Sequence, residues 1–229
     1  MINVVCVKWG DKYSSKDVNT LYRAMDENLR WAGNGSITFG QSFNFYCYTD
    51  DPTGLTDPIK IIPIESGLTG VWPKLDILNI FDKGETIYFD LDVIIMNPLT
   101  RLVSTNTRTL TVLYSQWKEG FLQPRAREKF PTLYNSSIMK WKDDQGKKIY
   151  DHFIKHKSEV LLKYKGIDRF LFNEPVEVDL FQTGIAYSYW KGVRYLKDTT
   201  PEKERTDFEV CILNEGPKEG LAKWTTKYL

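Results

Sequence analysis

The chain has 229 residues, of which 41% are hydrophobic and 27% are charged, and it carries a formal net charge of +1 with an isoelectric point near 7.6. These values are typical of one large globular domain, and they exclude a strongly basic nucleic-acid binder or a polybasic membrane anchor. No apolar run approaches the ~20 residues of a transmembrane segment, and the apolar start of the chain is too short for a signal peptide. We therefore expect a cytoplasmic protein with a small molecule as its partner.

The cysteine content also bears on the compartment. Cys6, Cys47 and Cys211 each lie within an apolar run of strand character, and their number is odd. A disulfide framework uses cysteines in pairs, so this pattern predicts buried thiols in a reducing compartment.

Strand and helix patterns alternate through the N-terminal third of the chain. Three segments have the pattern of strands: residues 2–7, 43–49 and 59–64. Ser14 or Ser15 can cap the helix that follows the first strand, and the apolar side chains of this helix recur at the spacing of one helical face: Val18, Leu21, Tyr22, Met25 and Leu29. Pro73 suits the first position of a second helix. A strand, a loop and a helix in this order have the geometry of a nucleotide site, because ligands of open α/β sheets collect beyond the carboxyl ends of the strands.

The most informative stretch contains two aspartates, Asp90 and Asp92, within an apolar run. The apolar residues of this run alternate with their neighbours: Ile87, Phe89, Leu91 and Val93 with Tyr88, Asp90, Asp92 and Ile94. Because alternate residues of a strand lie on opposite faces, we expect both aspartates to point the same way from a strand in the middle of a covered sheet. Two buried carboxylates need a cation, and a divalent ion would offset the desolvation of both. The alternative is a strand that ends in a solvated acidic turn.

The second half of the chain contains further strands and a long helical pattern. The strand patterns cover residues 109–115, 177–181, 184–189 and 208–213. Asp143 can cap a long helix whose apolar side runs from Ile149 to Tyr164. His152 and His156 on this helix have the spacing of two zinc ligands, but the pattern offers no acidic or thiol third ligand, so we expect surface histidines.

Three motifs together resemble a known family. Trp72-Pro73-Lys74-Leu75, a short helix, Gly84-Glu85 and then Tyr88-Phe89-Asp90-Leu91-Asp92 resemble the core of the GT-A fold glycosyltransferases, which include glycogenin and related bacterial enzymes. The resemblance implies an α/β, Rossmann-like single domain with a mixed central sheet flanked by helices. Residues 1–98 would form the nucleotide-binding half, which ends in the strand with the DxD motif, and residues 99–229 the half that faces sugar and acceptor.

The same resemblance implies a metal site. In the family, the DxD carboxylates hold Mn²⁺ or Mg²⁺ against the diphosphate of a nucleotide sugar, a role that falls here on Asp90 and Asp92, with Leu91 between them at the donor. The lysine that matches Lys74 reaches these carboxylates and the donor. Asn214-Glu215-Gly216-Pro217-Lys218 resembles a segment in which histidine is the third metal ligand and lysine meets the diphosphate. Glu215 replaces the histidine, Glu215 and Asn214 can supply oxygen ligands, and Lys218 would neutralise phosphate.

Other positions are assigned to the donor and the sugar by resemblance alone. The loop with Lys8, Trp9 and Tyr13 would lie at the nucleotide, and Thr49 and Asp50 would lie at its uracil base. Asn135, in an N-S-S segment, would meet the donor sugar. Asp168 would face sugar and acceptor, although Arg169 stands where the family usually has glutamine. By pattern alone, Asn135 is a turn residue and Asp168 a helix cap.

We therefore expect transfer of a sugar from a nucleotide donor, a UDP-sugar, to a hydroxyl of a glycan, small-molecule or protein acceptor. The resemblance to glycogenin favours retention of the anomeric configuration. A phosphatase would need the DxD pair at the first strand, and a nucleotidyltransferase would need a Gly-rich, Arg-containing loop there; the sequence has neither. The remaining alternative is a non-catalytic nucleotide-sugar or glycan-binding module, which the missing histidine favours.

Overall fold

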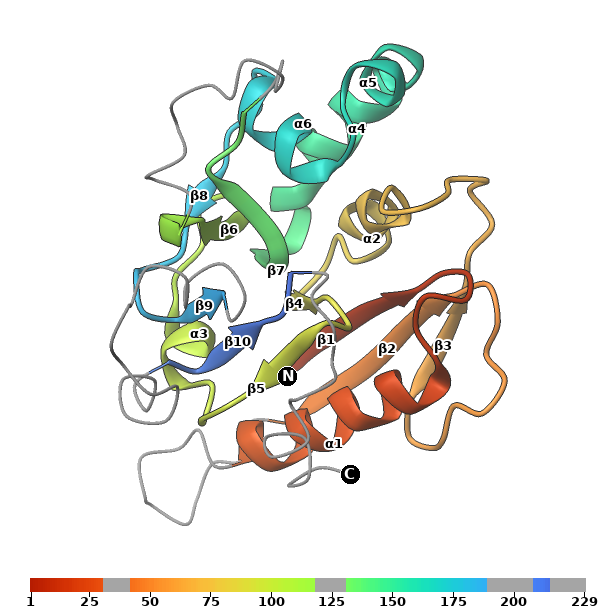
Figure 1. The fold of residues 1–229 in the computed structure, drawn as a ribbon, viewed down its shortest axis with the longest axis vertical. Helices are drawn as coiled ribbons and strands as arrows, with labels where there is room; N and C mark the ends of the chain where they lie inside the picture. Colours follow the sequence, from red (N-terminus) through yellow and green to blue (C-terminus); the bar gives the residue numbers. More distant parts are fainter. Residues whose placement is uncertain (31–41, 118–130, 189–207, 215–229) are drawn as a thin grey trace.

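The computed structural model describes residues 1–30, 42–117, 131–188 and 208–214, and the structural statements below concern these residues. A mixed seven-stranded sheet runs through the molecule with helices on both faces (Figure 1). Its strands, in spatial order, are β3 (Lys60–Pro63), β2 (Phe43–Thr49), β1 (Ile2–Lys8), β4 (Glu85–Phe89), β7 (Tyr134–Lys142), β6 (Thr111–Tyr114) and β8 (Asp179–Leu180).

The direction of the strands explains where a ligand can bind. β3, β2, β1 and β4 are parallel, whereas β7 runs antiparallel to both of its neighbours, β4 and β6. Lys8 pairs with Thr49 in register, so β1 and β2 end at the same edge of the sheet, and β4 ends close by at Phe89. The loops that follow these parallel strands therefore meet at one edge.

A second, three-stranded sheet has the order β5 (Val93–Ile95), β10 (Val210–Ile212) and β9 (Ala186–Ser188). β10 lies between β5, to which it is antiparallel, and β9, to which it is parallel. This sheet packs in the same hydrophobic cluster as α1 (Ser15–Arg30) and α3 (Thr100–Ser104). It brings a segment from the end of the described chain beside the end of β4.

Two hydrophobic clusters cover the two faces of the central sheet. On one face, α1 and the small sheet pack on Ile87 and Phe89 of β4. On the other face, Tyr88 packs with α2 (Pro73–Ile80), α4 (Lys147–Lys155), α5 (Lys157–Lys163) and α6 (Ile167–Asn173). This confirms the prediction that the apolar run before the aspartates is a strand covered on both faces, and it explains why parallel strands here are apolar throughout.

The predicted strand across the two aspartates is wrong beyond Phe89. β4 ends at Phe89, residues 90–92 form a turn, and the chain enters the small sheet as β5. The apolar alternation continues through Leu91 and Val93 because the chain passes from one covered sheet to another, so the pattern hides the turn. The aspartates thus occupy a turn between two sheets and not one face of a single strand.

The long helix predicted after Asp143 is also divided. Residues Asp143–Gly146 form a 3₁₀ helix, α4 ends at Lys155, and α5 begins at Lys157 after a break at His156. Asp143 does not cap the helix, because it has a positive φ of 50° and its Oδ1 accepts a hydrogen bond from Gly84 N (2.9 Å). Asp143 N in turn donates to Gly84 O (2.8 Å), so this residue fastens the start of β4.

The predicted strands and buried thiols are confirmed, with shorter elements, whereas Asn135 lies within β7 and not in a turn, and Asp168 lies within α6 and does not cap it. Every predicted strand is present, and those after residue 177 keep only two or three residues. Cys6, Cys47 and Cys211 are buried free thiols, as predicted. None of the described helices is long and apolar enough to cross a membrane.

Candidate functional site

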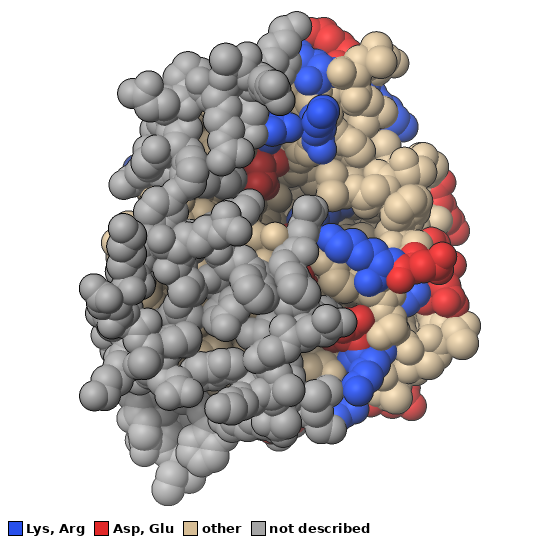
Figure 2. Space-filling model, viewed as in Figure 1, with Lys and Arg blue, Asp and Glu red and all other residues tan. Residues whose placement is uncertain are grey.

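A cavity of about 610 Å³ opens at the carboxyl edge of the parallel strands. Its lining comes from the loop after β1, the entry to α2, the turn after β4, the start of β7, the start of α6, and Asn214 after β10. Figure 2 shows basic and acidic side chains together in the middle of this face, where the surface is hollowed. Polar groups from distant parts of the sequence therefore share one space.

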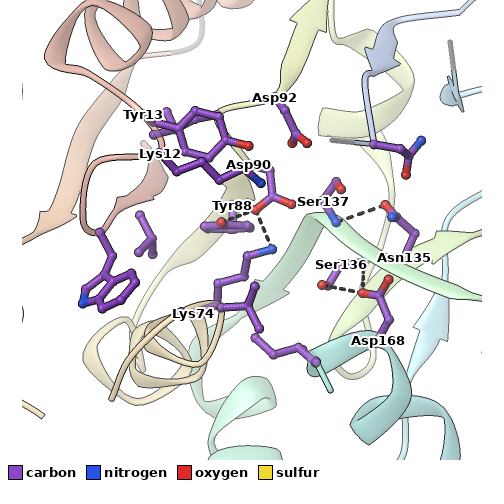
Figure 3. A pocket seen from close by; sticks show the side chains of 18 of the residues that line it. Lys12, Tyr13, Lys74, Tyr88, Asp90, Asp92, Asn135, Ser136, Ser137 and Asp168 are labelled. Carbon is purple, nitrogen blue, oxygen red and sulfur yellow. Dashed lines mark hydrogen bonds and ion pairs between the residues drawn. The ribbon is translucent and has the colours of Figure 1, made fainter. Parts of the chain in front are cut away.

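The floor of the cavity carries a three-residue contact around Asp90. Lys74 Nζ lies 2.5 Å from Asp90 Oδ1, and the Tyr88 hydroxyl donates a hydrogen bond to the same oxygen (2.5 Å; Figure 3). Lys74 also lies 5.2 Å from the centroid of the Tyr88 ring. Burial, and then the charge and hydrogen bond of Asp90, raise the pKa of Tyr88 well above its usual value, so the phenol stays protonated and donates.

This contact gives Lys74 a structural reason for its position. A lysine in the first turn of a helix is disfavoured by the helix dipole. Here the Asp90 carboxylate offsets that cost, and the side chain of Lys74 is only 11% exposed. Asp90 N donates to Ser137 O (2.8 Å), which fixes the turn against β7.

The other end of the turn, at Asp92, is joined to the residue before Asn214. Leu213 N donates to Asp92 O (2.9 Å), which joins the end of β10 to the turn. Asn214 follows directly, has a positive φ of 48°, and its side-chain amide donates to Ser188 Oγ. Asp90, Asp92 and Asn214 all line the cavity, and Figure 3 shows the two aspartates side by side.

The chemistry of this set fits a hard divalent cation. Two carboxylates and an amide oxygen are the ligand types that Mg²⁺, Mn²⁺ and Ca²⁺ accept. Within the described ranges, no group of three or more His, Cys, Asp and Glu side chains could hold a metal ion. The candidate site is therefore an acidic pair completed by an amide, and Glu215, the further ligand that the sequence predicts, lies outside the described residues.

β7 and α6 form the wall opposite the loop after β1. Asp168 Oδ1 accepts hydrogen bonds from Ser136 N (2.8 Å) and Ser136 Oγ (2.7 Å), and Thr132 Oγ1 donates to Asp168 O (2.9 Å). Asn135 Oδ1 accepts a hydrogen bond from Ser137 N (3.1 Å). Asn135 and Ser136 are nearly buried yet line the cavity. Amide, hydroxyl and carboxylate groups on this wall suit the hydroxyls of a sugar.

The loop after β1 carries Trp9 and Tyr13, which line the cavity. Gly10, with φ of 60°, makes the turn in this loop, and its N–H donates to Asp50 Oδ2 (3.0 Å). Asp50, at the end of β2, therefore holds the loop in place. Trp9 is 36% exposed, so a large part of its ring is accessible.

Lys8 and Thr49 lie behind this loop. Lys8 is only 5% exposed, and its Nζ donates to Asp51 O (3.1 Å). Thr49 Oγ1 donates to the same carbonyl (3.0 Å). Lys8, Thr49 and Asp50 do not line the cavity described above, although they support the loop that does. The assignment of Lys8 to the nucleotide, and of Thr49 and Asp50 to its uracil base, stays a prediction.

A buried carboxylate on α2 holds the entry to that helix. Asp76, 5% exposed, accepts hydrogen bonds from the hydroxyls of Tyr48 (3.0 Å) and Ser66 (2.5 Å). Burial is the main cause that raises the pKa of Tyr48 to about 12; the Ser66 hydrogen bond lowers it and the Asp76 charge raises it. The segment after Ser66 leads to Gly70 and Val71 in the cavity, so this contact positions both the loop and Lys74.

Most of the predicted site residues come together in the cavity: Trp9, Tyr13, Lys74, Asp90, Leu91, Asp92, Asn135, Asp168 and Asn214. Glu215 and Lys218 lie outside the described residues, so their predicted roles stay predictions. Sequence reasoning gave no role to Lys12, Tyr88, Ser136 and Lys165, which also line the cavity. Tyr88 could have been found, because it stands two residues before Asp90, and the predicted alternation places both on the same side.

The two histidines do not form a metal site with an acid cluster in the described chain. His152 Nε2 lies 3.1 Å from Glu174 Oε2, and its side chain is 22% exposed, so it is less exposed than a surface histidine. Lys163 Nζ (2.9 Å) and the Tyr164 hydroxyl (2.6 Å) donate to Glu174 Oε1. Glu174 thus joins the ends of α4, α5 and α6.

Similarity to known proteins is found in solved structures. No protein-family model and no curated protein matches the chain. The galactosyltransferase LgtC, in complex with donor and acceptor sugar analogs, matches with a TM-score of 0.62 at 14% sequence identity, over 99% of this chain and 93% of LgtC. An active-site mutant of LgtC matches with a TM-score of 0.57 at 15% identity, over 94% of this chain and 88% of the mutant.

The glycosyltransferase GlyE of Streptococcus pneumoniae TIGR4 matches with a TM-score of 0.60 at 14% identity. The match covers 100% of this chain and 60% of GlyE, so the chain spans about three fifths of the length of that protein. The chain therefore has the mixed α/β fold of these glycosyltransferases, which confirms the predicted fold class.

Proposed function

We propose that this protein is a metal-dependent glycosyltransferase that moves a sugar from a UDP-sugar to a hydroxyl group of an acceptor. The observation that carries the proposal is the convergence of Asp90, Asp92 and Lys74 with Asn135 and Asp168 in one cavity of about 610 Å³. An acidic pair beside a lysine suits a metal-bound diphosphate, and the amide and carboxylate opposite suit a sugar. The fold shared with LgtC, a galactosyltransferase, supports this assignment.

The metal in this proposal is Mn²⁺ or Mg²⁺. Asp90, Asp92 and Asn214 would hold it, and Glu215 is the further ligand expected from the sequence. Tyr88 and Lys74 occupy Oδ1 of Asp90, which leaves the other carboxylate oxygen for the ion. When bound, the ion supplies Lewis-acid stabilisation of the departing diphosphate.

The reaction needs charge stabilisation more than it needs a strong base. The acceptor oxygen forms a bond to the anomeric carbon of the sugar, and the bond from that carbon to the diphosphate oxygen breaks. The diphosphate leaves with the electron pair and takes the hydroxyl proton. Lys74, which is paired with Asp90, supplies positive charge beside the acidic turn, and Lys218 would add to that charge. Departure and attack on the same face would retain the anomeric configuration.

The sugar would lie between the acidic turn and the wall formed by β7 and α6. Asn135 can donate and accept hydrogen bonds with sugar hydroxyls. Asp168 is oriented by two hydrogen bonds from Ser136 to Oδ1, and a carboxylate accepts hydrogen bonds from hydroxyls of a sugar or an acceptor. The nucleotide would lie on the loop with Trp9 and Tyr13, with Thr49 and Asp50 toward the uracil.

The alternative is a binding module on the same fold that holds a nucleotide sugar or glycan without turnover. The two are separated by the release of UDP from a panel of UDP-sugars in the presence of Mn²⁺, with a mixture of hydroxyl acceptors. An enzyme releases UDP and forms a glycoside, and loses both activities when Mn²⁺ is removed with EDTA. Binding of UDP-sugars without product under any of these conditions would establish the binding module instead.

A further inference from the structure

An exposed apolar surface lies on the outer side of α4 and α5. Leu162 is 90% exposed, Ile154 is 45% exposed and Leu161 is 37% exposed. The inner side of the same helices holds Phe153 and Val160, which are buried in the hydrophobic cluster on that face of the central sheet. The apolar residues of α4 and α5 therefore face in two directions, and only the inner one is covered within the described part of the chain.

The three exposed side chains lie close together. Helical hydrogen bonds continue through the bend at His156, whose N–H donates into α4 and whose carbonyl accepts from Val160 N (2.9 Å). Ile154 and Leu161 are seven residues apart and therefore lie on the same side, two helical turns from each other, and Leu162 is next to Leu161. Figure 1 shows α4 and α5 at the upper end of the molecule, away from α1 and β3. A contiguous apolar surface of this kind marks an interaction site, whereas a single exposed apolar residue does not.

The charged residues of these two helices are mostly lysines. α4 and α5 contain five lysines, two acidic residues and no arginine. Lys147 pairs with Asp151 (2.8 Å), and Lys163 pairs with Glu174 (2.9 Å). The charged residues of α4 and α5 that form no ion pair with another described residue are three lysines and one acid: Lys148, Lys155, Lys157 and Glu159. The two helices therefore have a local positive excess, although the net charge of the whole chain is only +1.

This combination of residues matches the chemistry of an anionic lipid surface. The α4–α5 patch consists of Ile154, Leu161 and Leu162 together with Lys155 and Lys157. Apolar side chains enter the boundary between headgroups and acyl chains, and lysines keep their ammonium groups at the level of the phosphates. A protein partner matches the patch less well, because lysine is depleted in the core of protein–protein interfaces, whereas arginine and aromatic residues are enriched there. The patch has neither.

We propose that the α4–α5 patch docks on a membrane surface that contains anionic lipids. Ile154, Leu161 and Leu162 enter the headgroup boundary, and the two lysines of the patch contact lipid phosphates. α5 ends at Lys163, and the lining of the cavity begins two residues later at Lys165. Docking therefore holds the α6 wall of the cavity beside the membrane surface. The docking does not depend on the transfer reaction.

Co-sedimentation with sucrose-loaded vesicles tests the docking. One set of vesicles contains phosphatidylcholine alone, and the other contains equal amounts of phosphatidylcholine and phosphatidylglycerol. Each lysine at an anionic surface strengthens binding about fivefold, so we expect the parent protein to bind the anionic vesicles about tenfold or more tightly than the neutral ones. Added salt should weaken this binding, because counterions screen exposed charges.

Two variants separate the apolar contribution from the charged one. Leu162→Ser should weaken binding to the anionic vesicles about tenfold, because the apolar surface of the leucine is no longer removed from water. Lys155→Gln/Lys157→Gln should remove most of the preference for anionic vesicles. Because Leu162 is almost fully exposed, Leu162→Ser should keep the thermal midpoint of the parent, and Leu162→Gln replaces it if that midpoint falls.

The matched controls change similar residues elsewhere on the surface. Ile61→Ser removes an apolar side chain that is 48% exposed on the edge strand β3. Lys16→Gln/Lys83→Gln removes two exposed lysines, one from α1 and one from the loop before β4. Both control variants should bind the anionic vesicles as tightly as the parent does.

Several outcomes would overturn the inference. Equal binding to neutral and anionic vesicles does so, as does binding that Leu162→Ser leaves unchanged. Displacement from the vesicles by glycerol 3-phosphate would indicate a site for a soluble phosphate. A dimer that forms without lipid and that Leu162→Ser dissociates, measured by sedimentation equilibrium, would assign the patch to a second copy of this chain. None of these measurements uses UDP or Mn²⁺, so a negative result leaves the proposed function unchanged.

Discussion

The Tyr88 hydroxyl and the Asp90 carboxylate lie 2.5 Å apart, although Tyr88 belongs to the central sheet and Asp90 to the turn that leaves it. Tyr88 is 1% exposed, so its hydroxyl is a fixed donor at the floor of the cavity. With Lys74 on the same oxygen, the hydrogen bond orients the carboxylate before any ligand arrives. Orientation of this kind reduces the ordering cost of binding.

Tyr88→Phe tests this orientation directly. The substitution removes one hydrogen bond to a charged group and leaves Lys74 in place, so we expect affinity for Mn²⁺ with UDP to fall about tenfold, equivalent to about 1.5 kcal/mol. Calorimetric titration of Mn²⁺ and UDP measures the effect. Tyr46→Phe is the matched control, because the Tyr46 ring packs on Phe81 away from the cavity. An unchanged affinity in Tyr88→Phe would show that Lys74 alone orients Asp90.

Asp92→Asn tests the acidic pair. The substitution keeps the shape of the side chain but removes one of two negative charges at the turn, so metal-dependent donor binding should be abolished and the fold retained. Leu213 N donates to the backbone oxygen of Asp92, so the substitution leaves that contact intact. Thermal shift with UDP and Mn²⁺ provides the measurement, with the exposed Asp144→Asn as the control. Normal turnover in Asp92→Asn would contradict the assignment of the motif.

Glu174 gives the protein a predictable loss of stability in acid. Burial alone would raise the pKa of Glu174, but hydrogen bonds from Tyr164, Lys163 and His152 outweigh it and lower the pKa to about 2. A carboxyl group with a depressed pKa stabilises the folded state above its unfolded pKa, near 4.5. That contribution, at most about 3 kcal/mol, is lost as the pH falls from 4.5 toward 2.

Urea unfolding of the parent and of Glu174→Gln at several pH values measures this contribution. The variant should be less stable than the parent at pH 7. The difference between their free energies of unfolding should disappear as the pH falls from 4.5 toward 2. Glu159→Gln, on the exposed side of α5, should show no gap at either end. A gap of constant size from pH 7 to pH 2.5 would mean that the charge of Glu174 is not the cause.

Lys140 is a buried cation that binds the backbone at the C-terminal end of α3. It is 1% exposed, and its Nζ donates to the backbone oxygens of Val103 (2.6 Å) and Thr105 (2.7 Å) and lies 2.7 Å from Glu85 Oε1. Lys140→Met fills a similar volume but leaves these acceptors without their donor, so we expect a loss of about 3–5 kcal/mol in the free energy of unfolding. Chemical denaturation checks this value, and Lys148→Met, at an exposed position of α4, should change it by less than about 0.5 kcal/mol.

The central sheet was predictable because its strands obey a local rule. Ile87, Tyr88 and Phe89 are apolar in succession, and only a strand covered on both faces can bury all of them. The turn at Asp90 was not predictable from the same rule, because Leu91 and Val93 continue the alternation into a different sheet. A periodic pattern reports burial and does not identify the sheet in which a residue is buried.

Contacts between segments that are distant in the sequence could not be predicted either. Asp143 has the local features of a helix cap, but its side chain pairs with Gly84, 59 residues away. Asn135 and Asp168 line the cavity, and their roles toward the sugar stay predictions, whereas Lys165 reaches the cavity because the start of α6 packs beside β7. No spacing in the sequence encodes that packing.

The three cysteines have a practical consequence. All are buried without disulfide bonds, and Cys6 and Cys47 face each other in register on β1 and β2. Burial, followed by the hydrogen bond and charge of Cys47, raises the pKa of the Cys6 thiol, which makes it slow to alkylate. An introduced surface cysteine should therefore react alone with a maleimide dye under native conditions. This chain can then carry a single fluorophore at the mouth of its cavity without removal of its own thiols.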